Sequence, residues 1–536
     1  MSNKKTIFLA MIFFGLFGMA KASYAADFYV AQAAAGSGNG TSCANAYVYT
    51  WFNNSGNWAN PKISGKIGPG DMVHICGTIT GSAGGNALTF QGSGSSGSPI
   101  TLKFETDAVL TAPYWSSTTS GAIYCSGQSY ITIDGGTNGT IENSADGTAL
   151  QYQHDSAAIV TSCPNSEIKN VNIQNMYIRT EDTEDIADTI GISTAGASNT
   201  RIDNNTLSHT RIGIAASYSN GTTNVEVDHN TETYVEHGIS VGNLDQFAAD
   251  YANNYKIHDN DIGGGAYLWD SPSNAWHHDG IHCWNQSSPY SQISNLWIYN
   301  NYIHGKWGND QAYYNSTGGT HITAPIFLEH LTASVFNNVI DFDTSNALSV
   351  PDDTWVSAGG GVNIPATADP PRLYNNTMRV YAGYCWLADT PNGTSVHSYV
   401  ANNLCIIANS TGTGGIVATD MVNDSGSSVD YDVYSFAGES NCFSVGSNVN
   451  SLSAFQGYGY DIHGFSTSSP DLNTILAPLS GSPLIAAGAN LTSTGITALD
   501  SDKSGAARPA TGAWDIGAYQ YQSGSGTIVP NSPTGL

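Results

Sequence analysis

A short phrase of alternating apolar and polar residues recurs through the middle of the chain, and each copy contains an asparagine at an equivalent place. The copies read "VNIQNMYI", "TRIDNNTL", "VEVDHNTE", "YKIHDNDI", "LWIYNNYI", "SVFNNVI", "RLYNNTM" and "SYVANNLC". Alternation with a period of two is typical of a strand with one buried face. The aligned asparagines are Asn175, Asn205, Asn230, Asn260, Asn301, Asn338, Asn376 and Asn403.

These asparagines recur at intervals of several tens of residues, and no helical periodicity separates them. Short strands that repeat at such intervals predict a β-solenoid, in which each turn of chain supplies about three strands and the turns stack roughly 4.8 Å apart. An asparagine at the same corner of every turn can bond the amides above and below it. We therefore expect one internal asparagine ladder, with the extra residues of longer repeats forming loops outside.

A second phrase is offset from the first and reads "DTIGIS", "TRIGIA", "VEHGIS" and "HHDGIH". Stacking its glycines in register predicts one sheet of the solenoid. The isoleucines after the glycines form an inward column of β-branched residues, namely Ile192, Ile214, Ile239 and Ile281. The residue before the glycine is isoleucine in the first two copies, and then His237 and Asp279. Two apolar turns are thus followed by two titratable ones.

The register gathers titratable residues that are far apart in sequence over two adjacent turns. We expect Glu236, His237, His278, Asp279 and His282 to cluster, with Arg211 one turn away and able to pair with Glu236. Glu329, in "TAPIFLEHL", is expected at the far end of the same sheet. Trp269, Trp276 and Trp284 flank the cluster, and aromatic rings beside carboxylates suit the binding of sugar faces.

Strict alternation would turn Asp279 inward together with Ile281. Burying a lone carboxylate in an apolar interior would cost on the order of several kcal/mol of folding free energy, because the charge would have no partner. We therefore expect the strand to start at Gly280 and Asp279 to face solvent from the preceding turn.

The first 25 residues and the net charge of the chain indicate the compartment in which the protein acts. Residues 1–25 combine Lys4 and Lys5, an apolar run and a small-residue end, which predicts a secretory signal peptide.

The remaining chain has 13 basic and 43 acidic residues, a net charge of −30. That balance excludes nucleic acid and an anionic membrane as partners, because both require a positive surface. We expect a secreted or periplasmic protein.

The eight cysteines can form four disulfides in an oxidising compartment. Cys43–Cys76 and Cys125–Cys163 are plausible local pairs. Cys283 and Cys385 stand in similar phrases, "GIHCW" and "GYCW", but the predicted register separates them by three turns, or roughly 14 Å. A disulfide needs Cα atoms closer than about 7 Å, so we expect no bond between these two.

These features together resemble the right-handed parallel β-helix of the pectin-lyase-like superfamily, over roughly Asp27 to Tyr521. The opening "DFYVAQAAAGSGNGTSCANA" and the ending "SDKSGAARPATGAWDIGAYQY" are similar to the first and closing segments of its secreted bacterial members. The resemblance implies an all-β parallel β-helix with an N-terminal cap and first turns at 26–120, a central helix at 121–415, C-terminal turns and a closing segment at 416–524, and a linker-like tail at 525–536.

The phrase "HHDGIH" is similar to the Asn-Thr-Asp-Gly motif of polygalacturonases, which implies an acid–base role for Asp279. The chain lacks their adjacent Asp-Asp rung, their Gly-His-Gly and their Arg-Ile-Lys, so polygalacturonase activity itself is not implied.

Three function classes follow from the cluster. A polysaccharide-cleaving enzyme explains the titratable residues and the aromatic residues together, with Asp279, Glu236 and His237 catalytic and with His278, His282, Arg211, Trp269, Trp276, Trp284 and Glu329 contacting the glycan. Hydrolysis is favoured slightly over β-elimination, because few cations are present to neutralise a uronate. The alternatives are a lyase or epimerase acting on a uronic polymer, and a non-catalytic glycan-binding protein. Hydrolysis requires no cofactor; calcium bound by oxygen ligands, or zinc bound by the histidines, remains an alternative.

Overall fold

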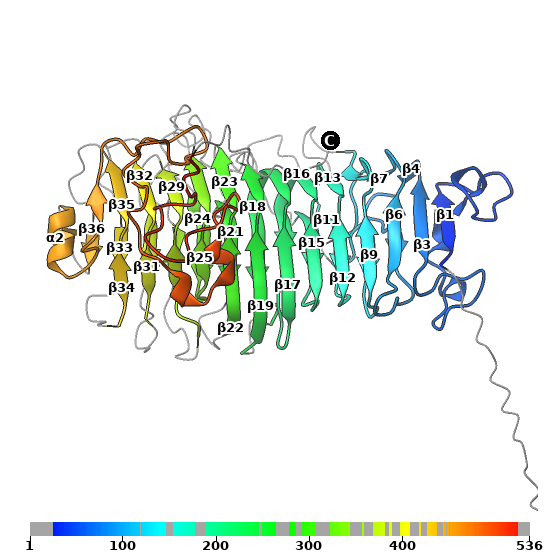
Figure 1. The fold of residues 1–536 in the computed structure, drawn as a ribbon. Helices are drawn as coiled ribbons and strands as arrows, with labels where there is room; N and C mark the ends of the chain where they lie inside the picture. The colour runs from blue at the N-terminus through cyan, green and yellow to red at the C-terminus, as the bar shows by residue number, and fades with distance from the viewer. Residues whose placement is uncertain are drawn as a thin grey trace, which may run out of the picture.

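The computed structural model describes residues 25–117, 119–145, 154–176, 189–245, 249–263, 278–285, 291–305, 322–342, 356–357, 368–380, 385–388, 397–407, 417–419, 426–436, 443–445, 448–449 and 451–523. Over these residues the chain winds into an elongated stack of short parallel strands, running from β1 at one end to α2 (Leu452–Gly457) at the other (Figure 1). The predicted right-handed parallel β-helix is confirmed.

The strands form three faces. The first face is one sheet of 14 strands, in the order β2 (Tyr47–Val48), β1 (Asp27–Ala31), β3 (Met72–Cys76), β6 (Ile100–Phe104), β9 (Ile131–Asp134), β12 (Ser166–Lys169), β15 (Thr200–Asp203), β17 (Thr223–Asp228), β19 (Tyr251–His258), β22 (Gln292–Tyr299), β25 (Ser334–Phe336), β28 (Arg372–Tyr374), β31 (Tyr399–Ala401) and β34 (Ser428–Asp430).

The second face stacks β4 (Thr78–Thr80), β7 (Val109–Ala112), β10 (Thr140–Asn143), β13 (Asn172–Gln174), β16 (Thr206–Ala215), β18 (Thr231–Gly242), β20 (Asp261–Gly263), β23 (Tyr302–Gly305), β26 (Val339–Phe342), β29 (Thr377–Val380), β32 (Leu404–Ile407), β35 (Val433–Phe436) and β38 (Phe465–Ser466).

The third face carries β5 (Leu88–Thr89), β8 (Ile123–Cys125), β11 (Ser156–Thr161), β14 (Thr189–Thr194), the later halves of β16 and β18, β21 (His278–Trp284), β24 (Ile322–Glu329), β27 (Val356–Ser357), β30 (Trp386–Ala388), β33 (Val417–Thr419), β36 (Phe443–Val445) and β37 (Asn448–Val449).

Two long strands, β16 and β18, belong to two faces at once. Each passes from the second face to the third through a residue with positive φ, His209 at +54° and Tyr234 at +54°. Their first halves pair with β13 and β20, and their second halves pair with β14 and β21. The two faces are therefore continuous in the middle of the solenoid.

The interior is filled by columns of apolar side chains, one column for each inward strand position. The predicted isoleucine column of the third face is confirmed, because Ile192, Ile214, Ile239 and Ile281 are consecutive register partners and are fully buried. The column continues to Ile326 of β24. Such stacking removes apolar surface from water along the whole length of the molecule.

The asparagine ladder is also confirmed, with one correction to its start. Each Nδ2 donates to the Oδ1 of the next turn at 2.9–3.0 Å through Asn205, Asn230, Asn260, Asn301, Asn338, Asn376 and Asn403. Asn175 was wrongly assigned to the ladder. Val171 takes that corner, because Ile173 pairs with Leu207 and the Val171 N–H donates to Asn205 Oδ1.

The expectation of a single ladder is wrong as well. A second row of asparagines lies at the surface, immediately before or near the start of first-face strands, and its members all have φ near +55°. Side-chain amides join Asn165, Asn199, Asn224 and Asn254 at 2.7–3.2 Å. Asparagine tolerates this left-handed conformation better than most residues, which explains its recurrence at the turn.

We predict that Asn301→Ala lowers the free energy of unfolding by about 1–3 kcal/mol, because Asn301 is fully buried and its loss leaves ladder partners unsatisfied. Chemical denaturation measures the change. Asn253→Ala is the control, since Asn253 is exposed and its amide oxygen accepts one bond from Asn295. Equal losses in the two variants would contradict a stabilising ladder.

One acidic residue lies inside the apolar core. Glu232 of β18 is the register partner of Leu207 and Ile262, and it is fully buried. Its carboxyl occupies the space beside Gly213, where a Cβ would collide with it. Neither carboxyl oxygen has a hydrogen-bond partner among the described residues, and burial raises the pKa of Glu232 to about 8.

We predict a pH-dependent loss of stability from Glu232. The folded-state pKa lies above the ordinary 4.5, so stability from this group is fully present below about pH 4.5 and is lost as the pH rises through about 8. Glu232→Leu should remove a decline of roughly 3–4 kcal/mol in unfolding free energy between pH 5 and pH 8. Denaturation at several pH values tests this, with Glu167→Leu as the half-exposed control. An unchanged pH profile in Glu232→Leu would contradict the prediction.

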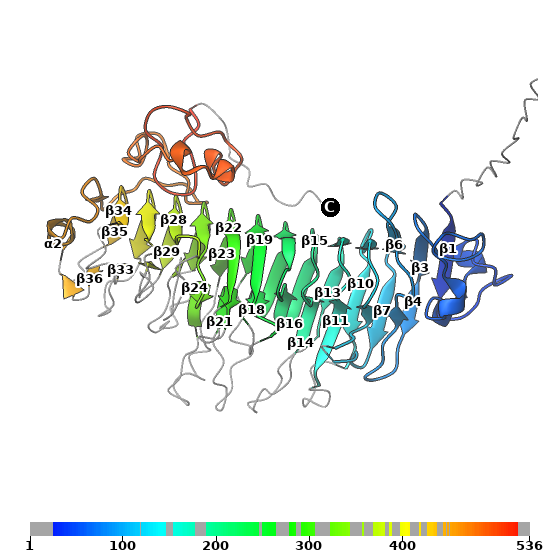
Figure 2. The ribbon, with the colours of Figure 1, turned by 90° about the horizontal axis from the view of Figure 1, so that it is seen from below.

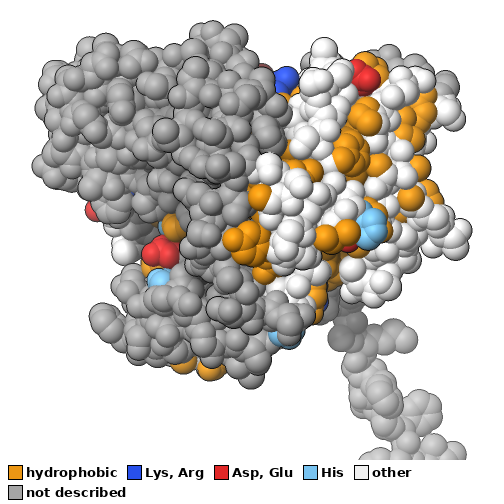
Figure 3. All heavy atoms as spheres, turned by 90° about the vertical axis from the view of Figure 1, so that its left-hand side faces the viewer, with side chains coloured by type: hydrophobic (Ala, Val, Ile, Leu, Met, Phe, Trp, Pro, Cys, Tyr) orange, Lys and Arg blue, Asp and Glu red, His pale blue; other side chains and the backbone are white. Residues whose placement is uncertain are grey.

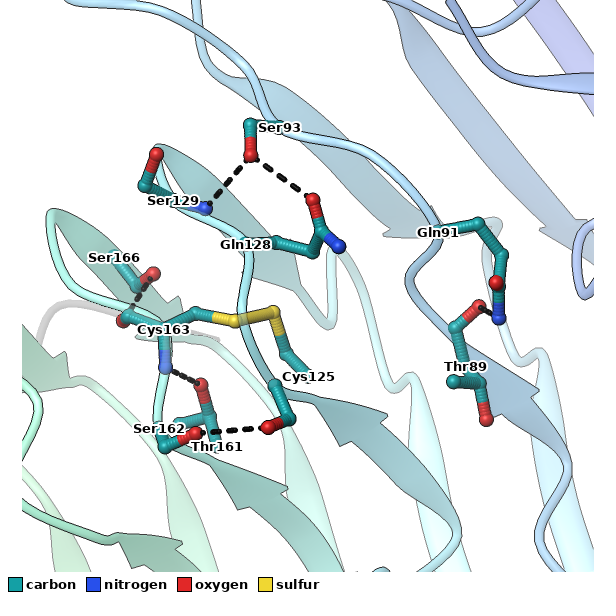
Figure 4. The surroundings of a disulfide bond; sticks show 11 residues. Thr89, Gln91, Ser93, Cys125, Gln128, Ser129, Thr161, Ser162, Cys163 and Ser166 are labelled. Carbon is teal, nitrogen blue, oxygen red and sulfur yellow. Dashed lines mark hydrogen bonds between the residues drawn. A yellow bond between two sulfur atoms is a disulfide. The ribbon is translucent and has the colours of Figure 1, made fainter. Parts of the chain in front are cut away.

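Disulfides join neighbouring turns. The predicted bonds Cys43–Cys76 and Cys125–Cys163 are confirmed, and Figure 4 shows the second, where the Cys163 N–H donates to Thr161 Oγ1 at 3.0 Å. A third bond joins Cys385 to Cys405, and Cys283 is a buried free thiol. The expected absence of a Cys283–Cys385 bond is confirmed, since β21 and β30 are three strands apart.

The last part of the described chain folds back over the first face (Figure 2). It contains two short 3-10 helices, η6 (Thr492–Thr494) and η7 (Thr497–Asp500), and its Trp514 packs with Phe336 and Tyr374. Figure 3 looks onto the α2 end, and among the coloured side chains visible there hydrophobic patches are common and charged ones are few. Among the described residues, no helix combines the length and apolar character needed to cross a membrane.

Candidate functional site

The titratable residues of the second phrase lie on the third face, where β16, β18, β21 and β24 are adjacent. Ile212, His237, Asp279 and Ala324 are register partners on the four strands. The predicted proximity of His237 and Asp279 is confirmed, since His237 Nε2 lies 3.4 Å from Asp279 Oδ2. Parallel pairing thus brings together residues more than 40 positions apart in sequence.

Six side chains form a continuous line of alternating bases and acids, which we call the polar chain. It runs in the order Arg211, Glu236, His237, Asp279, His282 and Glu329. Arg211 Nε lies 3.3 Å from Glu236 Oε2, and Glu236 Oε1 lies 3.3 Å from His237 Nδ1. Beyond Asp279, His282 Nδ1 lies 3.5 Å from Asp279 Oδ2, and His282 Nε2 lies 3.4 Å from Glu329 Oε2.

Exposure changes sharply along the polar chain. The side chains of Glu236 and Asp279 are completely buried, and that of Arg211 is 5% exposed. Glu329, at the last position of β24, is 43% exposed. The polar chain therefore connects a buried charge network to one carboxylate that faces solvent.

The expected position of Asp279 is wrong. The residue belongs to β21, which begins at His278, and its carboxylate is buried and not solvent-facing. A register shift between His278 and Asp279 relative to β24 places the Ala324 N–H 2.9 Å from Asp279 Oδ1. This bond and the two imidazoles offset the cost of burial, which the sequence argument had assumed to be uncompensated.

Burial by itself lowers the pKa of His237. The carboxylates of Asp279 and Glu236 on either side of the ring outweigh that effect and raise the pKa to about 9. The imidazole of His237 is therefore protonated and positively charged at neutral pH.

The other predicted site residues fall into three groups. Arg211 pairs with Glu236, as expected. Trp284 is half-buried, its ring lies 6.4 Å from that of His282, and its Nε1 donates to Ser240 Oγ at 3.4 Å. Trp269 and Trp276 lie outside the described residues, as does the side chain of His278.

Phe327 was not predicted from the sequence, and its ring stacks on His282 at 5.0 Å. Phe327 is the register partner of His282, and it lies two residues before Glu329 on the same side of β24. Extending the alignment of the second phrase by one turn would have identified it.

Two groups of described residues bring metal-type ligand atoms within 4.8 Å of one another. One is His237, Asp279 and His282 in the polar chain. The other lies on the outer side of the first face and comprises Glu226, Asp228 and His258.

No protein-family model matches the chain, and no curated protein matches it. Among solved structures, pectate lyase Pel9A is 13% identical, with 93% of this chain and 97% of that chain covered and a TM-score of 0.39. The alginate lyase from Paenibacillus sp. str. FPU-7 is 14% identical, with 72% and 93% covered and a TM-score of 0.35. The GH136 lacto-N-biosidase from Eubacterium ramulus is 12% identical, with 78% and 66% covered and a TM-score of 0.44. The parallel β-helix fold of this chain rests on its own strand pairings.

Proposed function

We propose that the chain is a secreted carbohydrate-active enzyme that cleaves an extracellular polysaccharide, and that the reaction is hydrolysis. The observation that carries the proposal is the polar chain, which ends at the exposed carboxylate of Glu329. The three disulfides support work in an oxidising compartment.

Glu329 is the group in this proposal that exchanges a proton with the substrate, because it is the most exposed member of the polar chain. His282 lies between the carboxyls of Glu329 and Asp279. Its contact with Asp279 holds the imidazole in place, and the imidazole in turn orients Glu329. Asp279, His237 and Glu236, which the sequence suggested as catalytic, are buried and act here by positioning His282.

Burial of Arg211 favours hydrolysis over β-elimination. A lyase acting on a uronic polymer needs a cation to neutralise the substrate carboxylate. Arg211 is almost fully buried and is held by Glu236, so its charge is already compensated. Lys306, which directly follows β23 in the sequence, lies outside the described residues.

A panel of neutral and uronic polysaccharides tests the proposal. Reducing ends released without the absorbance of unsaturated sugars indicate a hydrolase, and reducing ends released with that absorbance indicate a lyase. Altered uronate stereochemistry without cleavage indicates an epimerase. Retention on a polysaccharide without any chemical change indicates a binding protein. The proposal predicts the first result, and each of the others contradicts it.

A further inference from the structure

We propose that His237, Asp279 and His282 bind one divalent transition-metal ion of the zinc type. The inference adds a cofactor to the site of the proposed function. The experiment below measures bound metal and not activity. A chain without a metal site could therefore still cleave a polysaccharide, and a chain without that activity could still bind the metal.

The geometry of the two imidazoles carries the inference. His237 Nε2 and His282 Nδ1 converge on the same atom, Asp279 Oδ2, at 3.4 and 3.5 Å. Charge-assisted N–H···O hydrogen bonds are shorter, about 2.7–2.9 Å. Ligand atoms bound about 2.0–2.1 Å from a shared tetrahedral ion lie roughly 3.3–3.5 Å apart. Both nitrogen-to-oxygen distances therefore match the spacing of ligands around a common cation, and the three ligand atoms all lie within 4.8 Å of one another.

The surroundings of each imidazole point the same way. The second ring nitrogen of each imidazole also lies near a carboxylate: His237 Nδ1 is 3.3 Å from Glu236 Oε1, and His282 Nε2 is 3.4 Å from Glu329 Oε2. A metal-binding histidine usually directs its other nitrogen to a carboxylate, which fixes the tautomer and the ring orientation. Two imidazoles and one carboxylate form a ligand set suited to a first-row transition metal and not to calcium, which prefers oxygen ligands alone.

The second metal-type group lacks these features. His258 Nε2 and Nδ1 bond Glu226 and Asp259 at 2.9 and 2.8 Å, which are ordinary hydrogen-bond lengths. Asp228 is bonded by Arg201 through Nε and Nη2 at 2.8 and 2.6 Å. Its ligand atoms are already satisfied by protein groups. The cluster on the first face therefore supplies a matched control.

The experiment uses the full secreted chain, treated with a chelator, dialysed and titrated with Zn²⁺. Mass spectrometry of bound metal and calorimetry measure the stoichiometry and the affinity, and Co²⁺ absorbance reports the coordination geometry. We expect one tight ion per wild-type chain. Affinity should fall at least tenfold in His282→Ala and in Asp279→Asn, as expected for loss of a ligand. His258→Ala should bind as the wild type does, and melting temperatures establish that each variant is folded.

Absence of a tight Zn²⁺ site in the wild-type chain would overturn the inference, as would loss of the site in His258→Ala with retention in His282→Ala. Tighter binding of Ca²⁺ than of Zn²⁺ would also overturn it. If His282→Ala does not fold, Asp279→Asn decides the matter alone, because asparagine keeps the size and removes the anionic ligand.

Discussion

Replacing Glu329 by glutamine is expected to lower the rate of polysaccharide cleavage by about 10²–10⁴-fold, the usual contribution of general acid–base catalysis. Glutamine keeps the size of the side chain and its contact with His282, but it cannot exchange a proton. Glu329 is 43% exposed, so the substitution should change the melting temperature little. Initial rates of reducing-end release measure the effect.

Glu167→Gln on β12 is the control for Glu329→Gln, since Glu167 is a partly exposed carboxylate on the first face, paired with Lys169. It should retain wild-type activity. Wild-type activity in Glu329→Gln would remove this residue from the mechanism and would leave the exposed end of the polar chain without a catalytic role.

Asp279→Asn should lower activity by a similar factor of about 10²–10⁴, for a different reason. Asparagine can still accept the Ala324 N–H, but it removes the negative charge that faces both His237 and His282. The orientation of His282 then changes, and with it the contact between His282 and Glu329. A stability loss of about 1–3 kcal/mol should accompany the change, because the site is buried.

Asp228→Asn is the matched control for Asp279→Asn, because Asp228 is also fully buried and ion-paired but lies on the first face. Both variants are assayed well below their melting temperatures. Equal activity in the two variants would assign Asp279 to structure alone. Loss of activity in folded Asp279→Asn, with activity retained in folded Asp228→Asn, would support its positioning role.

Stacking order was predictable from the sequence because each turn repeats the same inward positions. The glycine and isoleucine of the second phrase were enough to align β16, β18 and β21, and hence to place His237 beside Asp279. The same register correctly separated Cys283 from Cys385. In a solenoid each turn contacts only its neighbours, so a correct local alignment yields correct long-range contacts.

Details that depend on one irregular turn could not be derived from the pattern. Asn175 matched the recurring asparagine by letter, whereas the apolar alignment of Ile173 with Leu207 places Val171 at the ladder. The burial of Asp279 depends on a register shift that presents the Ala324 N–H, and alternation contains no sign of such a shift. Cys385–Cys405 joins two different faces, so strand register alone did not indicate it.

We propose that Asp279 and Glu329 act as one unit through His282. A double-mutant cycle on initial cleavage rates tests this claim most directly, with Asp279→Asn, Glu329→Gln and the two combined. Residues that act as a unit show strongly non-additive effects, so the double variant should be about as slow as the slower single variant. Losses that multiply in the double variant would show that the two carboxyls act independently, and would contradict the polar chain as the working site.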